Sequence, residues 1–227
     1  GLRGIVAAVQ DEGAAERLIQ MAEHRDPAAS VAFAKSIVFA VPLSMLFFVP
    51  FLLAERFGLE HIDIYYLHRD DLDTPIAETV GAVGDLIRSG KIRYFGVSNY
   101  RGWRIAELVS ECEAQGVRLP VVCQPYYNLL NRMPEVEILP ACDHYGIGVA
   151  PYSPIARGVL TGKYMPGAPV PEGSRAARGD KRMMETELRE ESYEIAQTLR
   201  VHAAKTGRTL KQFALAWLWA NRVVTSV

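Results

Sequence analysis

The sequence predicts a parallel α/β fold, and three observations carry this prediction. Short apolar stretches typical of strands alternate with stretches whose apolar residues recur at helical spacing. The connections between them are short, and no linker or short-period repeat divides the 227 residues. A (β/α)₈ barrel usually needs roughly 250 residues. We therefore expect one domain over residues 1–227, folded as a tight or incomplete TIM (β/α)₈ barrel.

The composition is that of an ordinary globular protein. Hydrophobic residues make up 49% and charged residues 22% of the chain, and the net charge is −1, so nothing favours nucleic acid as a partner. The three cysteines (Cys112, Cys123 and Cys142) are far apart, odd in number and without a CxxC pair. This pattern favours a reducing, cytoplasmic setting and gives no support to a metal site. The first 30 residues lack a compact apolar region with a cleavage site, so we expect no secretory signal.

The N-terminal part begins as an α/β domain would and then becomes unusually apolar. Residues 4–9 predict a strand, and residues 14–23 predict an amphipathic helix. From Ser36 to Ala54 there is no charged residue, which reaches the length of a membrane span. Pro42 and Pro50 interrupt this segment, so buried strands or irregular core segments are the favoured interpretation, with a membrane association as the alternative.

The stretch from Ile62 to Asn99 is the clearest strand–helix–strand unit. A strand is expected over Ile62 to Leu67, a helix from about Thr74 to Ser89 and a second strand over Ile92 to Val97. Thr74 is expected to cap the helix and Gly90 to end it. Units of this kind are parallel and right-handed, with polar residues past the strand ends lining the functional face.

The alternation continues to the end of the sequence. The next elements expected are a helix over Gly102 to Gln115, a strand over Val121 to Gln124, a helix opened by Pro134 and closed at Gly146, and a strand over Ile147 to Tyr152. A long loop from Ser153 to Met184 is expected to be functional. Helices from Glu185 to about Lys205 and from Leu210 to Asn221, the second capped by Thr209, and a strand over Val223 to Val227 complete the chain.

Four successive strands end on residues able to form hydrogen bonds, namely His68, Ser98 with Asn99, Gln124, and Tyr152 with Ser153. In a barrel these groups meet at one mouth. Amide side chains can hold a carboxamide, and the Tyr152 ring can lie on a flat heterocycle. Ser153, Arg157, Lys163 and Arg175 are placed to hold phosphates. Together they predict a nicotinamide dinucleotide site without a glycine-rich GxGxxG fingerprint, which the sequence lacks.

Several longer motifs resemble one known family. They are IDIYYLHR at residues 62–69, GKIRYFGVSN at 90–99, QPYYNLLNR at 124–132, and YSP at 152–154 followed by GKY at 162–164. In this order they resemble the aldo-keto reductases, in the branch that includes bacterial general-stress-type reductases and potassium-channel β subunits. The resemblance covers about Leu53 to the end, so residues 55–227 are family-like and 1–54 are divergent.

The resemblance implies a TIM barrel that binds NADP(H) and reduces a small carbonyl compound. His68 falls on the family's catalytic histidine, which orients and polarises the substrate oxygen. Ser98, Asn99 and Gln124 fall on the residues that bind the nicotinamide carboxamide, and Tyr152 on the stacking aromatic. The phosphate-binding loop falls on Ser153, Pro154, Ile155, Ala156 and Arg157, with Lys163 and Arg175.

The sequence also departs from the family. No tyrosine precedes Tyr65, so the family's Asp-Thr-Ala-x-x-Tyr-Gly segment, with its proton-donating tyrosine, is absent. Lys35 is the candidate stand-in for the catalytic lysine. The sequence ends at the last expected strand, and we expect a chain that has lost its second-strand region and its tail. Two functions stay open: an NADP-dependent reductase, and a catalytically impaired cofactor-binding or regulatory relative.

Other residues have ordinary structural interpretations. Ser98 and Asn99 could cap the helix that starts at Gly102. Trp217 and Trp219 are expected to be buried against the sheet. The charges from Glu185 to Glu191 predict a solvated helix face.

Overall fold

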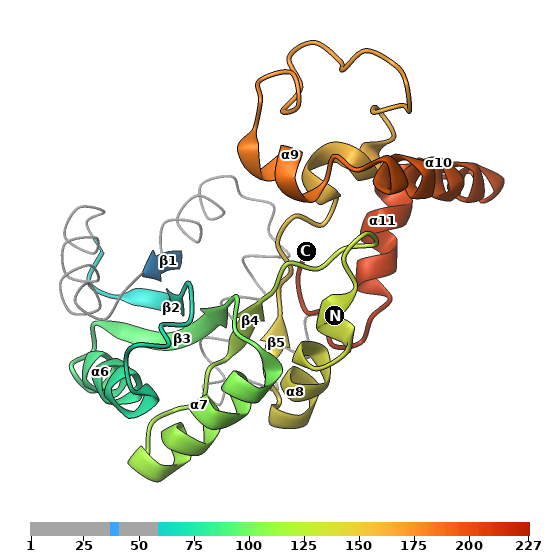
Figure 1. Cartoon of the computed structure of the whole chain (residues 1–227). Coiled ribbons are helices and arrows are strands. Elements are labelled where there is room, and N and C mark those ends of the chain that lie inside the picture. Colours follow the sequence, from blue (N-terminus) through green and yellow to red (C-terminus); the bar gives the residue numbers. More distant parts are fainter. Residues whose placement is uncertain (1–36, 41–58) are drawn as a thin grey trace.

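The computed structural model describes residues 37–40 and 59–227 (Figure 1). Within these two ranges, five parallel strands form one sheet whose order follows the chain. They are β1 (Ile37–Ala40), β2 (Ile62–Leu67), β3 (Ile92–Ser98), β4 (Val122–Gln124) and β5 (Gly148–Val149). A parallel sheet in sequential order, with helices between its strands, is the arrangement of part of a (β/α)₈ barrel. The predicted fold class is thus confirmed.

β1 is the described part of the apolar segment from Ser36 to Ala54. Its four residues pair in parallel with β2, from Ile37 opposite Ile64 to Ala40 opposite Leu67. The interpretation of this stretch as a strand is therefore confirmed for residues 37–40. The elements predicted for residues 4–9 and 14–23, and the candidate Lys35, lie outside the described residues.

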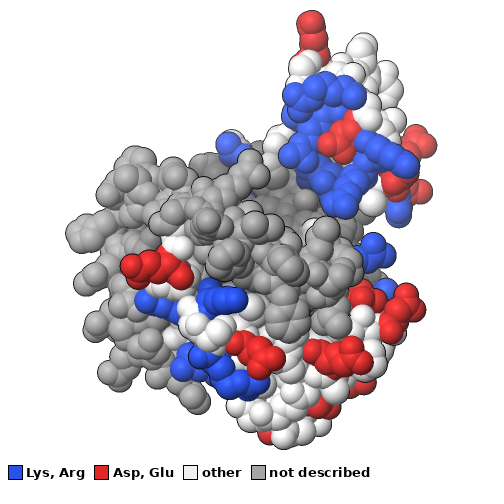
Figure 2. All heavy atoms as spheres, turned by 90° about the vertical axis from the view of Figure 1, so that its left-hand side faces the viewer, with Lys and Arg blue, Asp and Glu red and all other residues white. Residues whose placement is uncertain are grey.

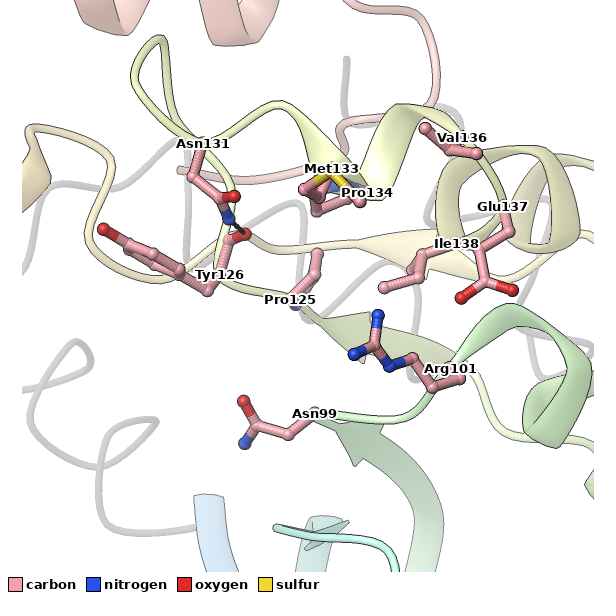
Figure 3. A pocket seen from close by; sticks show the side chains of 10 residues that line it. All are labelled: Asn99, Arg101, Pro125, Tyr126, Asn131, Met133, Pro134, Val136, Glu137 and Ile138. Carbon is pink, nitrogen blue, oxygen red and sulfur yellow. Dashed lines mark hydrogen bonds between the residues drawn. The ribbon is translucent and has the colours of Figure 1, made fainter. Parts of the chain in front are cut away.

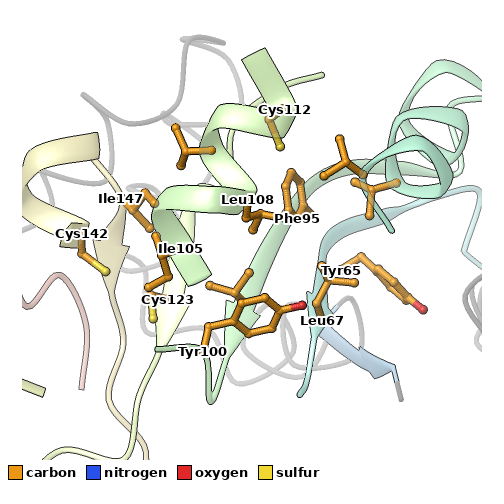
Figure 4. Close-up of a cluster of buried hydrophobic side chains, with 14 of the residues drawn as sticks. Tyr65, Leu67, Phe95, Tyr100, Ile105, Leu108, Cys112, Cys123, Cys142 and Ile147 are labelled. Atoms are coloured by element: carbon orange, nitrogen blue, oxygen red, sulfur yellow. The ribbon is translucent and has the colours of Figure 1, made fainter. Parts of the chain in front are cut away.

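Three helices pack on one face of the sheet: α6 (Ile76–Arg88), α7 (Gly102–Gln115) and α8 (Ile138–Tyr145) (Figure 1). Successive strand residues point to opposite faces, so Phe95 and Val97 of β3 join the core under these helices. Helix α7 contributes Ile105, Leu108 and Cys112, which are all fully buried beside Phe95 (Figure 4). This core holds the strands, and hence the residues at their carboxyl ends, in a fixed register.

A second, smaller core lies in the C-terminal part of the chain. It is formed around the 3₁₀ segment η2 (Ala156–Thr161) and the helices α9 (Lys181–Thr186), α10 (Glu190–Lys205) and α11 (Leu210–Trp219). Helix α11 joins the two cores, because Ala214 packs in the second and Leu218 in the first. As predicted, Thr209 caps α11, in a capping box with Gln212.

Two predicted strands are shorter than expected. The strand predicted over Ile147 to Tyr152 is reduced to β5, and the ladder resumes only at a bridge between Tyr126 and Tyr152. Pro125 and Pro151 lie between these two pairings and have no N–H to donate, which explains the interruption. The last strand, over Val223 to Val227, was predicted wrongly. Val224 forms a single bridge with Val149.

Several helix boundaries also differ from the predictions. The helix expected after Pro134 is divided into η1 (Met133–Glu135) and α8, because Glu137 has non-helical backbone angles. The helix expected from Glu185 starts at Glu190. Thr74 caps nothing, since its hydroxyl donates to Asp71 and Pro75 is the residue before α6. The predicted functional loop contains η2 and α9.

The C-terminal tryptophans behave differently from each other. Trp217 packs against the large core, with its ring 5.3 Å from that of Tyr127. Trp219 was predicted to be buried but is 64% exposed. Among the described residues, no helix combines the length and the apolar character that crossing a membrane requires.

Candidate active site

Asn99 connects the ends of three strands. It directly follows β3, and its side-chain amide donates to the backbone carbonyl of His68 at 2.8 Å and to the Ser98 hydroxyl at 3.0 Å. Its own carbonyl accepts a hydrogen bond from the Tyr152 hydroxyl at 3.0 Å. Asn99 adopts a left-handed backbone conformation with φ of 59°, which Asn tolerates better than most residues. The structure therefore brings His68, Ser98 and Tyr152 together around this one side chain.

Ser98 and Gln124 end the neighbouring strands β3 and β4 and are paired in register. The buried Ser98 hydroxyl donates to the backbone carbonyl of Gln124 at 2.9 Å. None of the hydrogen bonds of the described residues uses the Gln124 side-chain amide, which remains available to a ligand. The residue before α7 is Arg101, so Ser98 and Asn99 do not cap that helix.

Tyr152 is one of two stacked aromatic rings. Its ring lies 5.3 Å from that of Tyr126, with 27° between the planes. Burial raises the pKa of both hydroxyls, and a hydrogen bond to Glu187 raises that of Tyr126 further. Both phenols therefore hold their protons tightly at neutral pH. The two tyrosines therefore offer a ligand a flat aromatic surface and hydroxyls that can form hydrogen bonds. They are not suited to act as general acids.

The segment after Tyr152 has an unusual backbone. Ser153, Ala156 and Arg157 have φ of 55°, 46° and 50°, in the left-handed region that side chains rarely adopt, and Gly158 has φ of 107°. Asn128 helps to hold this turn by donating to the Ser153 carbonyl at 3.0 Å. None of the described hydrogen bonds uses the backbone amides of Ser153 and Ile155. Such a turn offers backbone donors to an anion.

Arg157 is held by a buried acid from a different part of the chain. Its Nε lies 3.5 Å from the carboxylate of Glu187, and the two side chains are 13% and 2% exposed. The Tyr126 hydroxyl donates to the same carboxylate. The expectation that residues 185–191 form a solvated face is thus wrong for Glu187. This residue follows α9 and turns inward, because the helix is interrupted there.

The other two basic candidates for phosphate binding, Lys163 and Arg175, are exposed. Lys163 lies beside the turn, since a Cβ added to Gly158 would meet its Cε at 3.3 Å. Arg175 precedes α9, and no described contact ties its side chain to the strand ends. Residues 157–189 contain seven Lys or Arg and four Asp or Glu. On the face of the molecule drawn in Figure 2, basic side chains gather in the upper part. This arrangement suits an anionic ligand.

A pocket of about 480 Å³ adjoins these residues (Figure 3). It shares Asn99 and Tyr126 with the cluster at the strand ends and extends toward η1 and the start of α8. Its lining residues are Asn99, Arg101, Pro125, Tyr126, Asn131, Met133, Pro134, Val136, Glu137 and Ile138. Its volume is typical of small-molecule sites.

The sequence-based reasoning missed Tyr126, Glu187 and Arg101 as parts of this site. Tyr126 follows a strand end by only two positions, and this spacing could have indicated it. Arg101 lies three positions after the end of β3, so the same kind of spacing could have indicated it. Glu187 gives no such signal, because its position depends on how distant segments pack.

The Aldo/keto reductase family model matches residues 53–227. An L-glyceraldehyde 3-phosphate reductase of Escherichia coli O157:H7 is 36% identical over 177 residues, which cover 76% of this chain and 50% of the relative. A probable voltage-gated potassium channel subunit beta of Arabidopsis thaliana is 37% identical over 175 residues, covering 76% and 53%. An aflatoxin B1 aldehyde reductase member 2 of Mus musculus is 41% identical over 110 residues, covering 48% and 30%. The chain spans about half the length of the first two relatives.

Proposed function

Because the chain belongs to the aldo/keto reductase family, we propose that it is an NADP(H)-dependent oxidoreductase that reduces aldehydes and ketones by hydride transfer. The observation that carries this proposal is the hydrogen-bonded cluster around Asn99, which unites polar groups from the ends of four successive strands. Names of relatives point in the same direction, since two of them are aldehyde or glyceraldehyde phosphate reductases. The free, buried cysteines agree with a cytoplasmic setting.

The residues present fit a nicotinamide dinucleotide. The unused Gln124 amide, together with Ser98 and Asn99, would hold the carboxamide, and the stacked rings of Tyr152 and Tyr126 would support the nicotinamide ring. The unused amides of Ser153 and Ile155, with Arg157 and Lys163, would hold the phosphates. Bound NADPH supplies the hydride. The chain's own task is to fix the ring against the substrate carbonyl.

His68 is the proposed catalytic residue at the end of β2. Its backbone carbonyl accepts a hydrogen bond from Asn99, and the residue is partly exposed. From there the imidazole would donate a hydrogen bond to the carbonyl oxygen of the substrate. Such a bond stabilises the negative charge that develops on this oxygen during hydride transfer.

One observation favours a second candidate function, that of a cofactor-binding or regulatory relative without turnover. Reduction also requires a proton donor. The raised pKa of Tyr126 and Tyr152 makes these two hydroxyls poor proton donors. One relative is by its name a potassium channel subunit beta.

Two measurements separate these functions. We expect saturable quenching of intrinsic fluorescence by NADPH in both cases, and consumption of NADPH with 4-nitrobenzaldehyde only for a reductase. A His68→Ala variant should retain binding and lose turnover. Turnover no higher than in this variant would reject the reductase, and an absence of quenching would reject both functions.

A further inference from the structure

Arg101 lines the pocket beside the candidate active site, and within the described part of the chain its guanidinium takes part in no hydrogen bond or ion pair. Neighbouring arginines differ. Arg104 is bonded to Asp70 and Glu107, and Arg132 to Glu135. Figure 3 shows the guanidinium reaching in among Asn99, Pro125 and Ile138. Arg101 is exposed, and an uncommitted guanidinium at the edge of a pocket can bind a carboxylate through two parallel hydrogen bonds.

The rest of the pocket is mostly apolar. Pro125, Met133, Val136 and Ile138 form its walls, and Met133 and Val136 are 64% and 73% exposed. Exposed apolar side chains around a pocket are available to the apolar part of a ligand. A ligand that satisfies both features carries an anionic group on an apolar body.

Glu137 limits the charge of this ligand. It lines the same pocket and does not form an ion pair with Arg101. In Figure 3 its carboxylate lies on the side of Ile138 away from Asn99. A second anionic group in the pocket would be repelled by this carboxylate. The pocket therefore favours a monocarboxylate over a dianion such as a phosphate monoester.

The pocket is built by close packing. A Cβ added to Gly102 would lie 2.8 Å from the carbonyl oxygen of Glu137, so the start of α7 touches the segment before α8. Arg101 and Glu137 are the residues that precede these two helices. Their backbones are thus fixed relative to each other, and the site is formed before any ligand binds.

From these observations we infer that the pocket is a binding site for apolar monocarboxylates, held by Arg101. The pocket shares Asn99 and Tyr126 with the proposed cofactor site. The carboxylate is therefore either the far end of the carbonyl substrate, a reading that rests on the proposed function, or a separate molecule bound beside it.

Calorimetric titration with 4-phenylbutyrate, without cofactor, tests the site directly. We expect saturable binding to the wild-type chain and a loss of roughly tenfold or more in Arg101→Gln. 4-Phenylbutanol, which lacks the charge, should bind weakly to both proteins. Arg88→Gln is the matched control, because Arg88 is an exposed arginine on α6. Arg101 makes no capping bond, so its replacement should leave the fold intact, which circular dichroism can verify.

Turnover distinguishes the two sources of the carboxylate. If it is the far end of the substrate, kcat/KM for 4-formylphenylacetate relative to 4-methylbenzaldehyde falls in Arg101→Gln. If it is a separate molecule, this ratio stays constant while 4-phenylbutyrate binding is lost. Either result supports the site. Absence of 4-phenylbutyrate binding, or equal binding by Arg101→Gln, overturns it. The calorimetric result does not depend on NADPH, so the proposed function can fail while the site stands.

Discussion

The carboxylate of Glu187 accepts a hydrogen bond from the hydroxyl of Tyr126, although 61 positions separate the two residues. Tyr126 in turn stacks on Tyr152, and the Tyr152 hydroxyl donates to Asn99. A buried acid beside the C-terminal helices thus supports the polar cluster at the strand ends. The proposed site depends on contacts between segments that are far apart in the chain.

Replacing Glu187 by Gln should destabilise the protein by about 2–4 kcal/mol, because the buried guanidinium of Arg157 loses its counter-charge. The midpoint of urea denaturation measures the change. Glu185→Gln is the control, since this side chain is 60% exposed and pairs weakly with Lys181. We expect a change within about 0.5 kcal/mol for the control. Equal midpoints for both variants would show that the buried pair contributes nothing.

The Gly102→Ala variant should also be less stable, by about 1–3 kcal/mol, because its new Cβ would overlap the carbonyl oxygen of Glu137. Gly81→Ala, in the neighbouring helix α6, is the contrasting control, because here we expect stability to rise instead of fall. Its Cβ would meet only the end of the Gln115 side chain, at 3.4 Å. It should stabilise α6 by up to about 1 kcal/mol. Thermal unfolding of both variants tests the pair, and a gain in stability for Gly102→Ala would contradict the close contact.

The sequence predicted the core elements well and the C-terminal ones less well. The bounds of β2 and α7 agree with the prediction residue for residue, because each has a clear apolar period and α7 ends at a glycine with positive φ. The interrupted ladder after β5 could have been expected from Pro125 and Pro151, which have no N–H to donate. The inward turn at Glu187 does not follow from local pattern, because it depends on the partners of a buried carboxylate, which only the packed structure supplies.

The same distinction holds for the candidate site. The strand-end residues could be found because parallel strands end at one edge of a sheet. Arg175, chosen for its charge and its place in the loop, has no described contact with them. Glu187 could not be found, since a solvated and a buried charge look alike in a sequence.

Acid should remove a small stabilising contribution of Glu135. Hydrogen bonds from Arg132 and Tyr127 hold the pKa of this carboxyl below its usual range. A lowered pKa in the folded state means that the contribution is present above the pKa of the unfolded chain and is lost as the pH falls through the folded pKa. Since Glu135 is partly exposed, we expect less than about 1 kcal/mol. Urea denaturation of the wild type and Glu135→Gln should differ at pH 7 and converge at low pH.

Two substitutions at Asn99 separate backbone strain from hydrogen bonding. Asn99→Gly and Asn99→Ala both lose the bonds to His68, Ser98 and Tyr152. Only alanine is also strained at φ of 59°, so it should be less stable than the glycine variant by about 1 kcal/mol. Both should bind NADPH more weakly than the wild type in fluorescence titrations. Unchanged NADPH binding by the glycine variant would remove Asn99 from the proposed carboxamide site.

Tyr152 combines two functions that substitution can separate, a ring that supports the nicotinamide and a hydroxyl that holds Asn99. Tyr152→Phe keeps the ring and loses one hydrogen bond, so NADPH affinity should fall by roughly fivefold. Tyr152→Leu removes the flat surface as well, and a loss of about tenfold or more is expected. Tyr145→Leu, at the C-terminal end of α8, is the control for nonspecific loss of an aromatic ring. If Tyr152→Phe and Tyr152→Leu lose equal affinity, the hydroxyl and not the ring determines binding, and the stacking role assigned to Tyr152 is wrong.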